Sequence, residues 1–235
     1  MKNINININK VRAIYYGLFS SLFSYIENEE EYKNIVKTLE FLSLTPIDEY
    51  SNEAFININN YLKEEGFSIL KEENNDLFFS PSTTFIPVTA SFYTEDRDDG
   101  QKRVEMTNLV LKSKFRKDSK SFKEAEDHIC FIFAFLQKLI QEDFSVENRL
   151  AYEVFSSILN EMIDEFINNI YSHENSQFYK NIAILLKVFI ELERSFYNIK
   201  DSKNSKNRKQ PELFHQKKKE FKQRAKRNFD EVTTL

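Results

Sequence analysis

Three glycines and four prolines among 235 residues restrict the fold of this chain more than any other feature. Barrels, sandwiches and nucleotide-binding sheets place glycine at tight turns and phosphate loops, where the backbone often needs a positive φ. The apolar fraction is 41%, with 23 Phe and 11 Tyr, so the chain can build a substantial core. The sequence therefore predicts an all-α fold, a single-domain helical bundle.

Apolar residues recur with a helical period along most of the chain. This pattern predicts helices at residues 11–26, 29–44, 48–64, 102–114, 121–141, 147–171 and 177–199. Residues 67–100 mix aromatic pairs with proline, serine and aspartate, and they predict a long ordered loop before the central helix. Ser121 and Glu124 have the spacing of a capping box, which predicts that the central helix begins there.

Charge is distributed unevenly along the chain. The net charge is −4, whereas residues 200–228 hold 12 Lys and Arg against 3 Asp and Glu. Asp230 and Glu231 follow this segment, so residues 1–199 carry −11. We expect an all-helical domain at 1–199 and a basic, flexible tail at 200–235.

The motifs of several enzyme classes are missing from the sequence. There is no glycine-rich phosphate loop and no Gly-x-Ser-x-Gly, and the single cysteine, Cys130, lies in an apolar run where a thiol is inert. Three scattered histidines and one cysteine give no zinc-binding spacing. The sequence therefore predicts no catalytic residue, no metal and no cofactor, and a protein that is not an enzyme.

The longest apolar run is too short to span a bilayer, and the opening MKNINININK lacks the apolar segment of a secretory signal. The expected location is the cytoplasm. The basic tail offers a way to bind nucleic acid or another anionic surface, but the acidic body offers no matching basic face. Nucleic acid is therefore not the expected partner.

Residues 124–131, EAEDHICF, place an acid and a histidine directly before the apolar run. Asp127 and His128 fit a catalytic pair, half of a metal site, a helix start or a contact point for another chain. An acid near the first turn of a helix also has a structural use, because it stabilises the positive end of the helix dipole. Without a nucleophile or further metal ligands in the sequence, the catalytic interpretation has no support.

Three stretches in order form a recognisable pattern: RAIYYGLFSSLF (12–23), IPVTASFY (86–93) and EAEDHICFIFAFLQKL (124–139). Together they resemble the TorD/DmsD/NarJ family of redox-enzyme maturation chaperones, over roughly residues 10–199. The positions that carry the resemblance are Tyr15, Leu18 and Phe19, then Pro87, Ser91 and Tyr93, and then Glu124, Asp127 and His128. The second stretch departs from the family pattern, since Val88, Thr89 and Ala90 replace a second proline and an aromatic residue or glutamate.

The resemblance implies a cytoplasmic chaperone that assembles a molybdenum-containing oxidoreductase. Such a chaperone binds the twin-arginine signal peptide of the catalytic-subunit precursor and holds the precursor until its cofactor is inserted, before export. Formate dehydrogenase and enzymes of the DMSO/TMAO-reductase type are compatible clients. The residues implied in signal-peptide binding are Glu124, Asp127, His128, Pro87, Ser91, Phe92 and Tyr93.

The residues also fit such a ligand independently. A body of −11 suits two arginines, because guanidinium and carboxylate pair bidentately. We expect Asp127 to be the arginine partner, and His128 either to donate a hydrogen bond to a backbone carbonyl of the ligand or to orient the acid. A histidine pKa near 6.5 predicts pH-sensitive binding. Aromatic residues in the predicted loop offer an apolar surface for the rest of the ligand.

Other functions remain open at the level of the sequence. A NarJ-like assembly factor binds a mature enzyme subunit without reading a signal peptide. A second alternative is a nucleic-acid or anionic-surface module that acts through residues 200–235. Both a monomer and a homodimer with exchanged helices fit the pattern.

Overall fold

The computed structural model describes residues 2–81, 83–120 and 122–201, with side chains from Ile6 onward in the first helix. Ser121 and all but the first two residues of the predicted basic tail lie outside the described residues. The division of the chain into 1–199 and 200–235 therefore stays a prediction.

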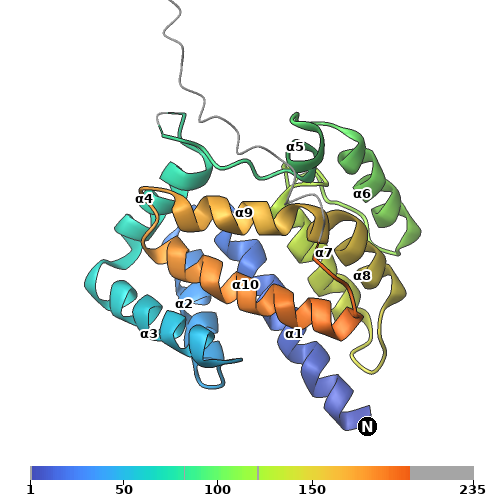
Figure 1. The fold of residues 1–235 in the computed structure, drawn as a ribbon, viewed down its shortest axis with the longest axis horizontal. Coiled ribbons are helices and arrows are strands. Elements are labelled where there is room, and N and C mark those ends of the chain that lie inside the picture. Colours follow the sequence, from blue (N-terminus) through green and yellow to red (C-terminus); the bar gives the residue numbers. More distant parts are fainter. Residues whose placement is uncertain (1, 82, 121, 202–235) are drawn as a thin grey trace, which may run out of the picture. The chain divides into compact units, whose positions relative to one another are not determined.

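Ten α-helices and one π-helical segment make up the described part of the chain, and it contains no strand (Figure 1). They are α1 (Lys2–Leu22), α2 (Glu29–Ser43), α3 (Glu49–Glu64), α4 (Gly66–Phe78), α5 (Ala90–Glu95), α6 (Gln101–Lys112), α7 (Ile129–Glu142), α8 (Arg149–Val154), η1 (Phe155–Leu159), α9 (Asn160–Ser172) and α10 (Phe178–Tyr197). This arrangement confirms the predicted all-α class.

The predicted loop at 67–100 is wrong in its extent, because it contains α4 and α5. Gly66 has a φ of 73°, which lets the chain turn between α3 and α4. The sequence did not predict α4, because two of its buried residues, Glu73 and Asn74, are polar and lie within the polar run KEENND. Glu73 accepts hydrogen bonds from the backbone amides of Gln177 (2.8 Å) and Tyr179 (2.8 Å) and so caps the start of α10.

The predicted start of the central helix is also wrong. Helix α7 begins at Ile129, and its N-cap is His128 rather than a residue near position 121. The preceding segment, residues 122–128, is not helical, since its backbone pairs with the segment before α5. The apolar run at 129–136 is nevertheless almost wholly buried, as its pattern predicts.

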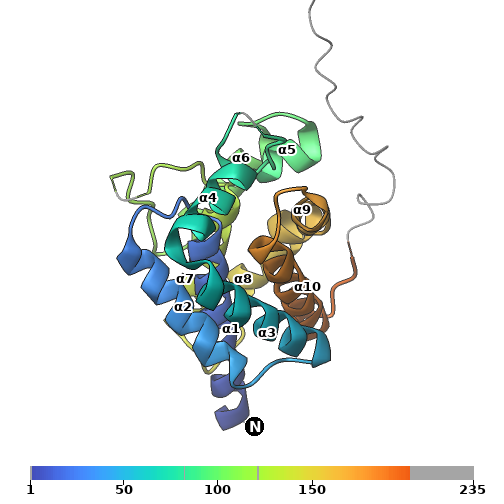
Figure 2. The ribbon, with the colours of Figure 1, turned by 90° about the vertical axis from the view of Figure 1, so that its left-hand side faces the viewer.

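The core is largely aromatic and lies where α1, α7, α9 and α10 meet. Helix α1 packs along α7, and α10 lies against α3 and α9 (Figure 1 and Figure 2). Phe23 contacts Phe166 at 5.0 Å between ring centroids, and Phe19 contacts Phe133 at 5.7 Å. These contacts explain the many phenylalanines: the rings from distant segments fill one shared interior.

A buried ion pair joins the first helix to the last. Arg12 donates to both carboxylate oxygens of Glu193, at 2.5 and 2.7 Å, and the Tyr16 hydroxyl donates to the same carboxylate at 2.6 Å. Both charged side chains are almost fully buried. A bidentate pair with a further donor satisfies the charges that burial would otherwise leave uncompensated.

Candidate functional site

Asp127 lies in the turn before α7, and its carboxylate holds the start of α5. The Oδ2 atom accepts hydrogen bonds from the backbone amide of Ser91 (3.0 Å) and from the Ser91 hydroxyl (2.5 Å). The N-cap residue of α5, Thr89, makes no capping bond of its own, and its hydroxyl donates to Asp98 at 2.6 Å. Asp127 therefore caps α5 from a distant part of the chain.

The backbones of the two segments are paired as well. The Ala90 amide donates to the Asp127 carbonyl at 2.9 Å, and the Ile129 amide donates to the Val88 carbonyl at 2.8 Å. An isolated antiparallel bridge joins Thr89 to His128. The two sequence stretches that carry most of the resemblance, 86–93 and 124–139, thus form one site.

Most of this site is closed to solvent. Asp127 and Ser91 are fully buried, and Tyr93 and His128 are buried at 2% and 7% exposure. The Oδ1 atom of Asp127 is buried without a hydrogen-bond partner among the described residues. A buried carboxylate oxygen without a donor is costly, so half of this carboxylate is unsatisfied in the structure.

His128 caps α7 and contacts the single cysteine. Its Nδ1 atom accepts from the Cys130 amide (3.2 Å) and lies 2.8 Å from the Cys130 Sγ. Burial lowers the pKa of His128 to about 4 and raises the pKa of the Cys130 thiol to about 12. At neutral pH the imidazole is therefore uncharged, with its proton on Nε2 because Nδ1 accepts a bond. Burial therefore removes the basis for the expected histidine pKa near 6.5, from which pH-sensitive binding was predicted.

The remaining predicted residues surround this closed centre. The Tyr93 hydroxyl donates to the Pro87 carbonyl at 2.8 Å and fixes the segment that enters α5. Phe92 stacks edge-on against Tyr93, at 5.9 Å between ring centroids. Pro87, Phe92 and Glu124 are partly exposed, whereas the other predicted site residues are buried.

An acidic connector between α5 and α6 adjoins the site, and sequence reasoning missed its role. Asp96 and Asp99 adopt positive φ values of 55° and 56°, which non-glycine residues rarely do. Glu95 accepts from the backbone amide of Gln101 at 2.5 Å and so caps α6. The signal in the sequence was the run EDRDDG directly before a predicted helix. This run keeps exposed carboxylates beside the α5 start.

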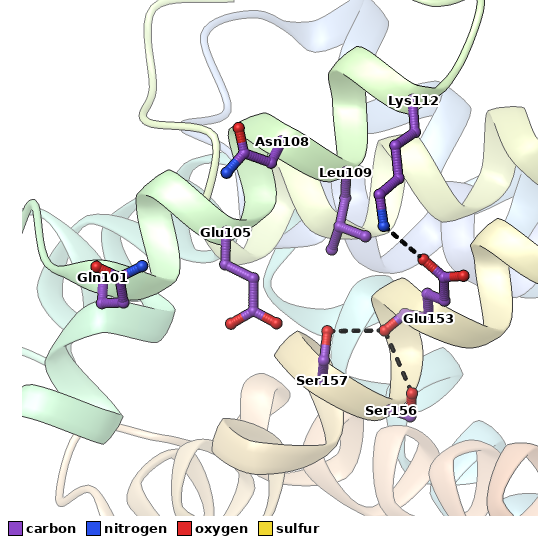
Figure 3. Close-up of a pocket in the computed structure, with 8 residues that line it drawn as sticks. All are labelled: Gln101, Glu105, Asn108, Leu109, Lys112, Glu153, Ser156 and Ser157. Atoms are coloured by element: carbon purple, nitrogen blue, oxygen red, sulfur yellow. Dashed lines mark hydrogen bonds and ion pairs between the residues drawn. The ribbon is translucent and has the colours of Figure 1, made fainter.

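A polar groove of about 380 Å³ lies between α6 and the α8–η1 segment (Figure 3). It is lined by Gln101, Glu105, Asn108, Leu109, Lys112, Glu153, Ser156 and Ser157. Lys112 pairs with Glu153 at 2.9 Å, and Lys102 pairs with Glu105 at 3.0 Å. The Ser157 hydroxyl donates to the Glu153 carbonyl at 2.9 Å. The Lys112 and Glu153 charges in the groove are already paired with each other. The groove is therefore a weaker candidate for ligand binding than the Asp127 carboxylate, one oxygen of which has no donor among the described residues.

The described residues contain neither a metal-binding cluster nor a membrane-spanning helix. No group of three or more His, Cys, Asp or Glu side chains in that part of the chain is placed to hold a metal ion. None of the helices between residues 2 and 201 is long and apolar enough to cross a membrane.

A crystal structure from Archaeoglobus fulgidus, assigned as a redox enzyme maturation protein, has a similar fold. The TM-score is 0.53 at 22% sequence identity, and the match covers 77% of this chain and 93% of that chain. At this identity the likeness concerns the fold alone. This chain and that protein thus share an all-helical fold.

A sequence profile described as the nitrate reductase delta subunit matches residues 45–172, which is more than half of the chain. The chain belongs to this family of NarJ/TorD-type chaperones, which confirms the resemblance seen in the sequence. The matched span includes both stretches that form the candidate site. Family and fold together give the chain the role of a redox-enzyme maturation chaperone.

Proposed function

We propose that this chaperone binds the twin-arginine signal peptide of a molybdenum-enzyme precursor at the junction of α5 and α7. The observation that carries the proposal is the buried carboxylate of Asp127, whose Oδ1 atom has no donor among the described residues. A guanidinium group has paired donors that match both oxygens of a carboxylate. An arginine of the ligand thus satisfies an acceptor that the fold itself leaves open.

Binding at Asp127 requires the start of α5 to move, because the carboxylate is fully buried in the structure. Two hydrogen bonds from Ser91 then exchange for two from the guanidinium, so the number of bonds to the carboxylate does not fall. Helix α5 has only six residues, and Asp127 holds its start, so α5 is the element that we expect to move. Ser91, once released, is free to bond the ligand backbone.

The surrounding residues serve the rest of the peptide. The Nε2 proton of His128 is available to a ligand carbonyl, since Nδ1 is already occupied. Pro87 and Phe92 supply apolar surface for the uncharged part of the peptide, and Tyr93 adds to it once α5 has moved. Glu124 is partly exposed and offers a second carboxylate for the second arginine.

The biological role follows from this ligand. The chaperone holds the precursor of a catalytic subunit in the cytoplasm until its cofactor is inserted, and export follows. Formate dehydrogenase and DMSO/TMAO-reductase-type enzymes are the proposed client classes. The chaperone itself catalyses no reaction in this scheme and acts through binding alone.

Calorimetry with a synthetic twin-arginine signal peptide tests the proposal. Asp127→Asn keeps the shape of the side chain and removes its charge, so the affinity should fall by about thirtyfold or more. Glu153→Gln is the matched control, because it makes the same change in the groove between α6 and η1. Equal affinities for the unchanged protein and Asp127→Asn contradict the proposal.

A second candidate function is an assembly factor that binds a mature enzyme subunit and reads no signal peptide. Two observations favour it: the family description concerns a nitrate reductase subunit, and Asp127 is closed in the structure. Pull-down of a client with and without its leader separates the two functions. Under this second function, removal of the leader leaves binding unchanged.

A further inference from the structure

An apolar corner joins α2 to α3 on the surface. Leu44 and Tyr50 are 77% and 71% exposed, more than any other large apolar side chain among the described residues, and Phe41 is 55% exposed. The three lie within ten residues of one another in the sequence. Helix α2 buries Ile35, Leu39 and Leu42 as its core-facing stripe, so Phe41 and Leu44 project away from the core. Three exposed apolar side chains at a single helix–helix connection are typical of an interaction surface.

The corner is a defined structure rather than a loose loop. Asp48 caps α3, and it forms a reciprocal capping box with Ser51. The amide of Leu44 donates to the Phe41 carbonyl at 3.4 Å, and that of Thr45 donates to the Leu42 carbonyl at 3.2 Å. Helix α2 therefore ends, and α3 begins, at fixed points. A partner meets a preformed surface and does not have to order it.

Acidic residues flank the apolar residues of the corner in the sequence. Residues 37–53 contain four acids, all exposed, and a single basic residue, Lys37. Glu40, Glu49 and Glu53 form no ion pair within the described part of the chain. Unpaired charges next to exposed apolar groups favour a partner that carries apolar and basic side chains together.

The corner is separate from the site at Asp127. Helix α5 lies at one end of the described fold and the α2–α3 connection lies at the other, in both views (Figure 1 and Figure 2). One bound segment at the α5–α7 junction thus leaves the corner free. The corner is also independent of the signal-peptide proposal, since none of its residues belongs to that site.

We propose that the α2–α3 corner is a docking surface for a basic amphipathic helix of a partner protein. The apolar face of such a helix covers Phe41, Leu44 and Tyr50, and its lysines or arginines meet the surrounding carboxylates. A second copy of this chain fits less well, because two identical acidic corners repel each other. Nucleic acid and anionic lipid surfaces are disfavoured by the same charges.

The test uses the full chain and a labelled synthetic helix of about five turns, with leucine on one face and lysine on the other. Fluorescence anisotropy should show binding that weakens as salt rises, since exposed charges are screened. The double variant Phe41→Ser with Leu44→Ser should bind about tenfold more weakly or worse. Glu49→Gln with Glu53→Gln should also weaken binding and reduce its salt dependence.

The matched control is Val104→Ser with Leu111→Ser on α6, which removes two other exposed apolar side chains (51% and 56% exposed). It should leave the affinity unchanged. The proposal is overturned if the control weakens binding as much as the corner variant, or if a leucine–glutamate peptide binds equally well. Sedimentation that shows a dimer lost only in the corner variant overturns it in favour of self-association.

Discussion

The Oδ2 atom of Asp127 lies 2.5 Å from the hydroxyl of Ser91, across 36 positions of the sequence. This contact joins the start of α7 to the start of α5 and closes a carboxylate whose other oxygen has no partner among the described residues. The same contact keeps the site shut and defines what a ligand must displace. The bond therefore stabilises the fold, and it must break when the proposed ligand binds.

Removal of the Ser91 hydroxyl should destabilise the fold. Ser91→Ala takes away one of the two donors to Oδ2 and leaves a buried charge less satisfied, so the free energy of unfolding should fall by about 1–3 kcal/mol. Urea denaturation followed by circular dichroism measures this change. Ser145→Ala is the control, because its hydroxyl bonds Asp143 on an exposed loop, and it should change stability by less than about 0.5 kcal/mol.

Stability should fall with acidification through His128. Its folded pKa of about 4 is below the usual value of 6.5, so the unfolded chain binds the proton first. Below an unfolded pKa of about 6.5, the free energy of unfolding therefore decreases, by about 2 kcal/mol from pH 7 to pH 5. Urea titrations at both pH values check this, and His128→Asn should show a smaller loss than the unchanged protein. Equal losses in the two proteins contradict the assignment.

Signal-peptide affinity, by contrast, should not vary with pH between about 6.5 and 8 through this residue, since His128 stays neutral across that range. Calorimetry at both ends of the range measures it. A midpoint near 6.5 that disappears in His128→Asn contradicts the neutral imidazole described above.

The Arg12–Glu193 pair should be sensitive to the loss of either partner. Arg12→Met leaves the Glu193 carboxylate buried without its cation, and the expected loss of stability is about 3–5 kcal/mol. Arg12→Met with Glu193→Leu removes both charges, so it should cost less than the sum of the single changes. The exposed pair Lys33–Glu29 is the control, and Glu29→Gln should cost less than about 1 kcal/mol. Additive costs at the buried pair mean that the two side chains are not coupled.

The sequence predicted the helices that show a clean apolar stripe. Helix α10 was expected at 177–199 and spans Phe178–Tyr197, because its buried side chains recur with the helical period. Helix α4 was missed because Glu73 and Asn74 are polar yet buried, and their partners come from α1 and α10. A local sequence pattern cannot predict such contacts between distant segments.

The candidate site shows the same limit. The family pattern brought Pro87, Ser91 and Asp127 together, and the structure places these segments in contact. Burial of the Asp127 carboxylate and the neutral state of His128 depend on packing from distant segments, so neither was predictable. The exposure of Phe41 and Leu44 was not predictable either, since both fit within the apolar pattern of the predicted helix at 29–44.

The most direct measurement of the central claim is a double-mutant cycle between Asp127→Asn and replacement of each signal-peptide arginine by glutamine. Calorimetry gives the four affinities for each cycle. If one arginine pairs with Asp127, its cycle should show a coupling energy of about 1.5 kcal/mol or more. Coupling near zero for both arginines contradicts a direct contact between this carboxylate and the ligand.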